Sequence, residues 1–305
     1  MQHTVQHKRV ERSALIVGIG ANAVMGLAGV AVFLATGIEA IFLDAAITLI
    51  ALVSGVVAIW ISKRSVRTTE RFPNGLFALE PVYAIGKAIL TIALLAFSLI
   101  SVSQSALDYV RYGIGEKMTL GPVVYYEIAM VAIGLGLFAY YRRENARIGG
   151  SSTLLVAESK ATFVDAVISG GIGAVAVLLL FVPDGSPLAF LHYTGDFFIT
   201  TLLVAVSAKE PIGVLRDALV ELVGGVHNDD QINAMVEAEA QRHLPEGTDY
   251  EQTLIFKTGM NYTVDVYLSG TDTTIGVADL VECKRKLERE LTKRLHIVDV
   301  DFVFD

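Results

Sequence analysis

Cysteine is nearly absent from the sequence, with Cys283 as its single instance among 305 residues. One thiol excludes an internal disulfide framework and any metal cluster held by several thiolates. Histidine is scarce too, and all six histidines fall outside the strongly apolar runs: His3, His7, His192, His227, His243 and His296. The sequence also has no His-Glu zinc motif, nucleophile elbow or phosphate-binding loop. These absences argue against an enzyme, and a membrane enzyme is the least favoured interpretation.

Acidic residues outnumber basic ones about two to one at the C-terminal end of the chain. From Glu221 to Asp305 there are 17 acidic and 8 basic residues, a net charge of −9, while the whole chain carries −8. Such a segment argues against nucleic acid as a partner, because phosphate backbones bind basic surfaces. It fits a soluble domain that meets cations, although a merely solvated acidic surface explains most of these residues equally well.

Long apolar runs make up most of the remaining chain. Apolar residues account for 53% of the sequence, and its mean hydropathy is +0.55. A helix needs about 20 apolar residues to cross a bilayer, and six segments meet this requirement, near 13–36, 39–62, 81–107, 122–141, 157–182 and 196–215. Several are rich in Gly and Ala, which permits close approach of helix backbones in lipid. We therefore expect a membrane all-α domain, a six-helix transmembrane bundle, over residues 1–215.

Basic side chains gather at the N-terminus and in alternate loops. The set comprises Lys8, Arg9, Arg12, Lys63, Arg64, Arg67, Arg71, Arg142, Arg143 and Arg147, whereas the opposite loops contain only Arg111 and Lys117. Because basic loops stay on the cytoplasmic side, the pattern predicts that both termini are cytoplasmic. We expect an integral protein of the cell (inner) membrane.

The pattern changes after residue 215. The stretch "DDQINAMVEAEAQRHL" predicts an amphipathic helix with Asp229 or Asn228 as its N-cap. Two alternating stretches on either side of Gly259 predict a β-hairpin. A second amphipathic helix and the strand "HIVDVDFVFD" follow. This order predicts a cytoplasmic α+β domain of ferredoxin-like type over residues 216–305.

Three stretches resemble the cation diffusion facilitator (cation efflux) family. "RFPNGLFALEP" (71–81) is similar to the family's loop between its second and third helices. "IEAIFLD" (38–44) resembles the start of its second helix, and "VAESKATFVDAVIS" (156–169) resembles its fifth. The tail resembles its dimerising domain in length and element order. The resemblance covers nearly the whole chain and implies a homodimer that transports a divalent metal cation.

The resemblance also implies a cation site in the bilayer, built from one pair of ligands on helix two and one on helix five. Residues four apart lie on one helix face, so two facing pairs can surround one ion. On helix five, Asp165 matches the second ligand, but Ala161 occupies the position of the family's histidine. The chain is therefore a divergent member that lacks the usual histidine-containing site.

On helix two the match depends on one gap. With the gap, Ile47 and Ala51 take the ligand positions and Asp44 lies one turn earlier; without it, Asp44 and Thr48 are the pair. In both registers Asp44, Thr48 and Ala51 share a face.

Oxygen atoms are the ligands that remain. We expect Asp44 and Asp165 to bind the metal, with Thr48 and Asn22 as further oxygen donors. Without histidine the site lacks the nitrogen ligands that suit zinc, and oxygen ligands favour magnesium or manganese.

A lysine lies about seven residues into the third apolar helix. Lys87 would be costly unless paired or neutral, and we expect it to compensate the charge of Asp44, Asp165 or Glu80. The alternative is that its side chain reaches the interface.

Two functions remain. The leading hypothesis is a homodimeric secondary-active transporter that exports a divalent metal cation from the cytoplasm by proton antiport with alternating access. The alternative is a non-transporting structural or regulatory relative that acts through homo- or heterodimerisation. In the tail, His296, Asp299 and Asp301 are either metal ligands or ordinary surface residues of a strand.

Overall fold

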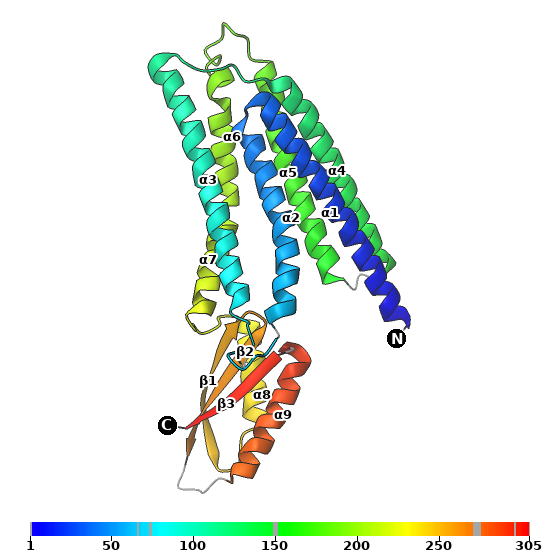
Figure 1. The fold of residues 1–305 in the computed structure, drawn as a ribbon, viewed down its shortest axis with the longest axis vertical. Coiled ribbons are helices and arrows are strands. Elements are labelled where there is room, and N and C mark those ends of the chain that lie inside the picture. The colour runs from blue at the N-terminus through cyan, green and yellow to red at the C-terminus, as the bar shows by residue number, and fades with distance from the viewer. Residues whose placement is uncertain are drawn as a thin grey trace. The chain divides into compact units, whose positions relative to one another are not determined.

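A computed structural model describes residues 2–65, 67–72, 75–148, 152–270, 276–295 and 297–304. Its elements follow the chain in the order α1 (Gln2–Thr36), α2 (Glu39–Ser65), α3 (Leu79–Tyr112), α4 (Leu120–Arg147), α5 (Thr153–Leu180), α6 (Leu191–Ser207), α7 (Lys209–Leu222), α8 (Asp230–Arg242), β1 (Thr248–Thr258), β2 (Asn261–Gly270), α9 (Val277–Leu295) and β3 (Ile297–Phe304) (Figure 1). Within these residues, six helical segments are long and apolar enough to cross a membrane. The predicted fold class is confirmed: six such helices precede a small domain that contains a sheet.

The chain divides into two compact units. The first comprises Met1–Val56 and Leu90–Pro211, and the second comprises Val57–Ile89 and Ile212–Asp305. Helices α2 and α3 therefore each contribute to both units. The boundary that the sequence predicts between residues 215 and 216 stays a prediction.

The sixth apolar segment is broken near its middle. It spans Leu191–Leu222, with α6 ending at Ser207 and α7 starting at Lys209. Pro211 explains the break, because proline has no N–H to donate to the carbonyl of Ser207 and is tolerated only in the first turn of a helix.

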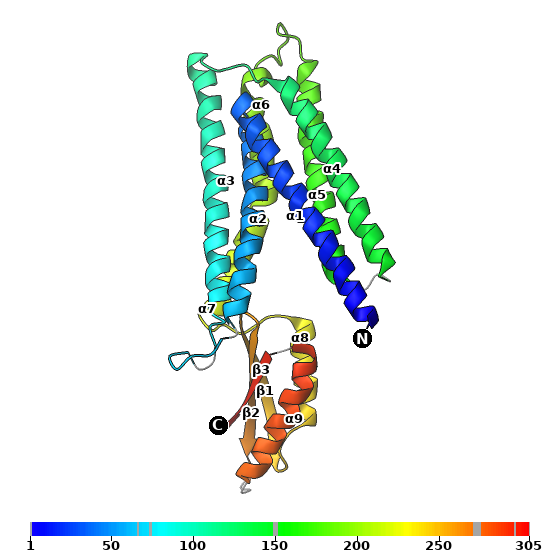
Figure 2. The same ribbon diagram turned by 45° about the vertical axis from the view of Figure 1, so that its right-hand side comes forward.

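Close packing at glycines joins the helices of the first unit. Helices α4 and α5 run side by side (Figures 1 and 2), and a Cβ atom at Gly134 of α4 would lie 2.9 Å from the Cβ atom of Ala166 on α5. Helix α1 meets α2 and α4 at Gly29, where a Cβ atom would lie 2.7 Å from the Cβ of Ala45. Since lipid provides no hydrophobic drive between helices, such contacts depend on small residues. The apolar core around them draws one or more residues from each of α2 to α6, among them Ile41, Leu95, Tyr126, Ile172 and Leu203.

The loops at one end of this unit are tied together. Lys117 pairs with Asp184 at 2.5 Å, joining the α3–α4 loop to the α5–α6 loop. The rings of Tyr109 and Tyr193 stack with their centroids 4.7 Å apart. The hydrogen bond and the charge of Lys117 lower the pKa of the exposed Asp184 carboxyl.

In the second unit, the described residues form a three-stranded sheet in the order β1-β2-β3. Strands β1 and β2 form the predicted antiparallel hairpin, which turns at Gly259 with a φ of +59°. Strand β3 pairs with β2 in parallel, so the chain must cross over between them, and α9 provides that crossover. Helices α8 and α9 cover one face of the sheet (Figure 2), and their buried side chains, such as Val236 and Leu287, form its core.

The start of α8 confirms one of the two predicted N-caps. A carboxylate oxygen of Asp229 accepts hydrogen bonds from the backbone N–H groups of Gln231 and Ile232, both at 3.0 Å. The cap satisfies two donors that the first helical turn leaves without partners. The element order helix, strand, strand, helix, strand is also as predicted.

The tail residues that the sequence singles out do not form a metal cluster in the described structure. His296 lies outside the described residues. Asp301 pairs with Lys284 of α9 at 3.1 Å, as a surface strand residue would. Throughout the described ranges, no group of three or more His, Cys, Asp or Glu side chains could hold a metal ion.

The glycine contact between α4 and α5 gives a first prediction. Gly134→Val should lower the free energy of unfolding by about 1–3 kcal/mol, the usual cost of overpacking, because the added side chain meets Ala166. Gly136→Val is the matched control, since a Cβ atom there would meet nothing within 4 Å. Thermal unfolding in detergent, followed by circular dichroism, measures both variants. Equal stability of the two would show that close approach at Gly134 is unimportant.

Candidate cation site in the membrane helices

Two of the predicted ligands lie near one another in the structure. Asp44 is half-buried on α2, and Asp165 lies on the exposed side of α5 within the single chain. The charge of Asp165 acts on Asp44, while the charges that act on Asp165 are those of Glu210 and Glu158. Because like charges repel strongly away from water, a cation between Asp44 and Asp165 would stabilise both. The role of this pair as metal ligands stays a prediction.

Thr48 stands one turn after Asp44 on the same face of α2. Its hydroxyl donates a hydrogen bond to the backbone carbonyl of Asp44 at 3.0 Å. The donor is thereby used within the helix, while the oxygen keeps lone pairs that can approach a cation. Thr48 fits the predicted role of an additional oxygen ligand.

Asn22 lies further from this pair along the helices. Gly29 of α1 packs against Ala45, and Gly26 packs against Leu49 and Thr48, so α1 and α2 run in opposite directions past one another. In this register, Thr48 lies one turn from Asp44, and Asn22 lies at a level about one turn further in the same direction. Its role as an oxygen donor stays a prediction.

The two residues proposed to balance charge both lie on the part of α3 that belongs to the second unit. Glu80 lies against the hairpin turn, where a Cβ atom at Gly259 would be 2.7 Å from its Oε2 atom. Its Oε1 atom is buried and accepts no hydrogen bond from the described residues. Lys87 is half-buried two turns further along α3. Neither position shows which carboxylate Lys87 compensates, so that role stays a prediction.

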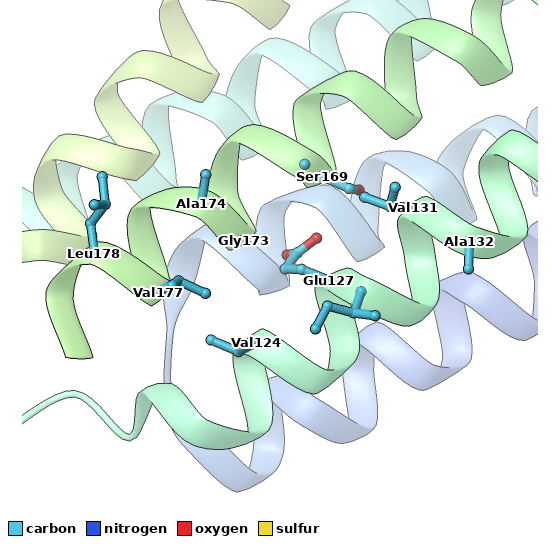
Figure 3. A pocket seen from close by; sticks show the side chains of 11 residues that line it. Val124, Glu127, Val131, Ala132, Ser169, Gly173, Ala174, Val177 and Leu178 are labelled. Atoms are coloured by element: carbon cyan, nitrogen blue, oxygen red, sulfur yellow. The ribbon is translucent and has the colours of Figure 1, made fainter. Parts of the chain in front are cut away.

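The sequence reasoning missed Glu127. This glutamate of α4 is only 1% exposed, and its side chain points towards Gly173 and Ser169 of α5 (Figure 3). It borders a cavity of about 710 Å³ between the two helices. The signal available in the sequence was a single carboxylate inside an apolar run.

Asp196 of α6 was also missed, and it has a structural role. Its two carboxylate oxygens accept hydrogen bonds from the backbone N–H groups of Glu39 and Ala40, at 2.8 and 3.1 Å. The hydroxyl of Thr200 donates to the same carboxylate at 3.1 Å. The negative charge thus caps the positive end of α2, and it fixes the helix that carries Asp44.

The cap leads to a second prediction. Asp196→Ala should lower the free energy of unfolding by about 0.5–2 kcal/mol, the usual range for a lost N-cap, because two backbone donors lose their acceptor. Asp196→Asn should lose less, since the amide oxygen still accepts one bond. Glu116→Ala, which changes an exposed loop carboxylate, is the control and should unfold like the parent protein. Thermal unfolding in detergent compares the three. An unchanged midpoint for Asp196→Ala would contradict the assigned role.

Comparison with known proteins identifies a family for the membrane helices. The family model described as the cation efflux transmembrane domain matches residues 15–223, which is more than half of the chain. A comparison with curated proteins finds no match.

Proposed function

Because this chain belongs to the cation efflux family and is thus an integral membrane protein that transports cations, we propose that it exports a divalent metal cation by proton antiport. The observation that carries the proposal is the pair Asp44 and Asp165, two carboxylates on different apolar helices whose charges interact. Two negative charges match one divalent cation. A pair of this kind would be unfavourable in a bilayer without a cation or protons.

The ligand set suits a hard cation that retains water. Asp44, Asp165 and the Thr48 hydroxyl supply oxygen, with Asn22 as a further donor. Magnesium is commonly held by one or two carboxylates while it keeps several of its waters, so few protein ligands suffice. Zinc prefers nitrogen and sulfur ligands in a closed tetrahedron, and neither α2 nor α5 contains a histidine or a cysteine.

Protons would drive release of the metal. A carboxylate must be deprotonated to bind a metal, so protons and metal compete for the same oxygens. In an alternating-access cycle, cytoplasmic metal displaces protons from Asp44 and Asp165, and protons from the outer side displace the metal.

We propose that Lys87 and Glu80 adjust the charge balance of this cycle, that both termini are cytoplasmic, and that the protein is a homodimer of the inner membrane.

The second candidate is a regulatory or structural relative that does not transport. It is favoured by the loss of the histidine position at Ala161. It is weakened by the retained carboxylates, because a buried charge without a use is a cost to stability. Flux measurements on reconstituted protein separate the two candidates.

A third prediction tests the carboxylate pair. Asp165→Asn and Asp44→Asn should each reduce cation flux into proteoliposomes more than tenfold and abolish its dependence on pH, because the amide cannot exchange a proton for a metal. Asp184→Asn, in an exposed loop, should transport like the parent protein. Lys87→Ala should shift the pH profile without abolishing flux. Normal flux by Asp165→Asn in a folded protein would remove Asp165 from the site, and loss of folding alone would make its role structural.

A fourth prediction concerns the ion. The parent protein should bind zinc in this site more weakly than a histidine-bearing relative does, and Ala161→His should raise zinc affinity at least tenfold by restoring a nitrogen ligand one turn before Asp165. Val164→His adds the same side chain on another face of α5 and should not raise it. Titration calorimetry with zinc and manganese measures both. Nanomolar zinc binding by the parent that survives removal of His296, Asp299 and Asp301 would overturn the predicted preference for hard cations.

A further inference from the structure

Glu127 differs from the other buried acidic side chain of α4 in having no ion-pair partner among the described residues; the Ser169 hydroxyl is the polar group that its carboxylate approaches. Glu144 is 7% exposed and pairs with Arg147 at 2.6 Å. Glu127 is 1% exposed, and neither of its carboxylate oxygens has a hydrogen-bond partner among the described residues. An ionised carboxylate in such surroundings is strongly unfavourable, so the side chain requires a cation.

The cavity beside Glu127 limits which cation this can be. Glu127 and Ser169 are its only ionisable or hydroxyl-bearing lining residues, and the other nine are apolar or glycine: Val124, Ile128, Val131, Ala132, Gly170, Gly173, Ala174, Val177 and Leu178. Figure 3 shows the carboxylate lying between α4 and α5, directed at Gly173 and Ser169. A divalent metal here would meet one carboxylate and one hydroxyl in an otherwise apolar lining, so one negative charge would face two positive ones, whereas the pair Asp44 and Asp165 supplies two. A proton needs one oxygen.

The packing of α4 against α5 leaves room for the Glu127 side chain at Gly173 of α5. A Cβ atom at Gly173 would lie only 2.9 Å from the Cβ atom of Glu127. Asp165, Ser169 and Gly173 follow one another at intervals of four and so share a face of α5. Glu127 therefore lies about two helical turns beyond Asp165 along this face.

We propose that Glu127 is a proton-binding site of the transport cycle, separate from the carboxylate pair that binds the metal. The proposal rests on the proposed metal–proton exchange. Asp44 of α2 is the ionisable side chain whose charge acts on Glu127 from a neighbouring helix. Helix α1 has no ionisable residue from Ser13 to Thr36, and α5 has only Asp165 from Ala161 to Leu180. On α4 itself, the adjacent Tyr126 is the nearest titratable group in sequence.

The charge at Asp44 provides the coupling. A divalent cation held by Asp44 and Asp165 cancels the two negative charges of the pair, which removes an electrostatic attraction that favours a proton on Glu127. Metal binding from the cytoplasm would thus release a proton from Glu127, and reprotonation would weaken metal binding. No hydrogen bond joins the carboxylates of Glu127 and Asp44 among the described residues. The coupling between them is therefore electrostatic and needs no shared ligand.

The test uses dicyclohexylcarbodiimide, an apolar reagent that adds to protonated carboxyl groups within membranes. The full-length protein is reconstituted in phosphatidylcholine liposomes, treated at a series of pH values, and the adduct is located by mass spectrometry. Glu127 should be labelled at low pH, and labelling should fall at least fivefold as pH rises. Manganese should reduce labelling at a fixed intermediate pH. Glu127→Gln should lose the adduct at this position, whereas Glu116→Gln, in an exposed loop, should retain it.

Flux measurements provide an independent readout. Glu127→Gln should still bind manganese but transport it without dependence on the pH gradient, and Glu127→Asp, which keeps the carboxylate, should retain the dependence. If Glu127→Gln does not fold, labelling of the parent protein and the flux of Glu127→Asp decide. Unlabelled Glu127, labelling that ignores pH and manganese, or normal pH dependence in Glu127→Gln would overturn the proposal. If labelling responds to pH and manganese but the parent moves no metal, the proton site stands and the proposed export fails.

Discussion

A carboxylate in a bilayer must be neutralised, and each acidic side chain of the apolar helices meets this requirement differently. Asp196 receives two backbone N–H groups from the first turn of α2, so a helix end balances its charge. Glu144 pairs with an arginine three residues later. Asp44, Asp165 and Glu127 have neither solution among the described hydrogen bonds and ion pairs. Acidic groups that the fold itself leaves unbalanced are the ones available to a transported cation.

Glycine determines where those unbalanced carboxylates lie. Gly29, Gly134 and Gly173 each bring two helices so close that a methyl group would collide with a neighbour. Gly29 brings α1 against α2 at Ala45, the residue that follows Asp44, and Gly173 leaves the space that the Glu127 side chain occupies. The acidic positions and the small residues are thus parts of one arrangement, because a carboxylate can be enclosed between helices only where their backbones approach closely.

Much of the fold could be predicted from the sequence, because its signals are local. Apolar length marked the six membrane helices, alternation marked the hairpin at Gly259, and a short polar residue before an amphipathic run marked the cap at Asp229. The interaction of Asp44 with Asp165 was expected from the family resemblance. What could not be predicted depends on contacts between distant segments. The capping of α2 by Asp196 joins residues 156 and 157 positions apart, and hydropathy gives the depth of Glu127 in an apolar run but not the helix that it faces.

A separate proton site would change how exchange is enforced. When metal and proton compete for one carboxylate, each excludes the other completely and exchange is obligatory. When they occupy different carboxylates, the exclusion is as strong as the electrostatic interaction between the sites. Two unit charges about 10 Å apart at an effective dielectric constant of about 20 interact by roughly 1.7 kcal/mol, which is more than a tenfold change in affinity. A divalent ion doubles that energy. Coulomb coupling is therefore strong enough to link metal export to proton entry, because the mostly apolar lining of the cavity beside Glu127 keeps the local dielectric constant low.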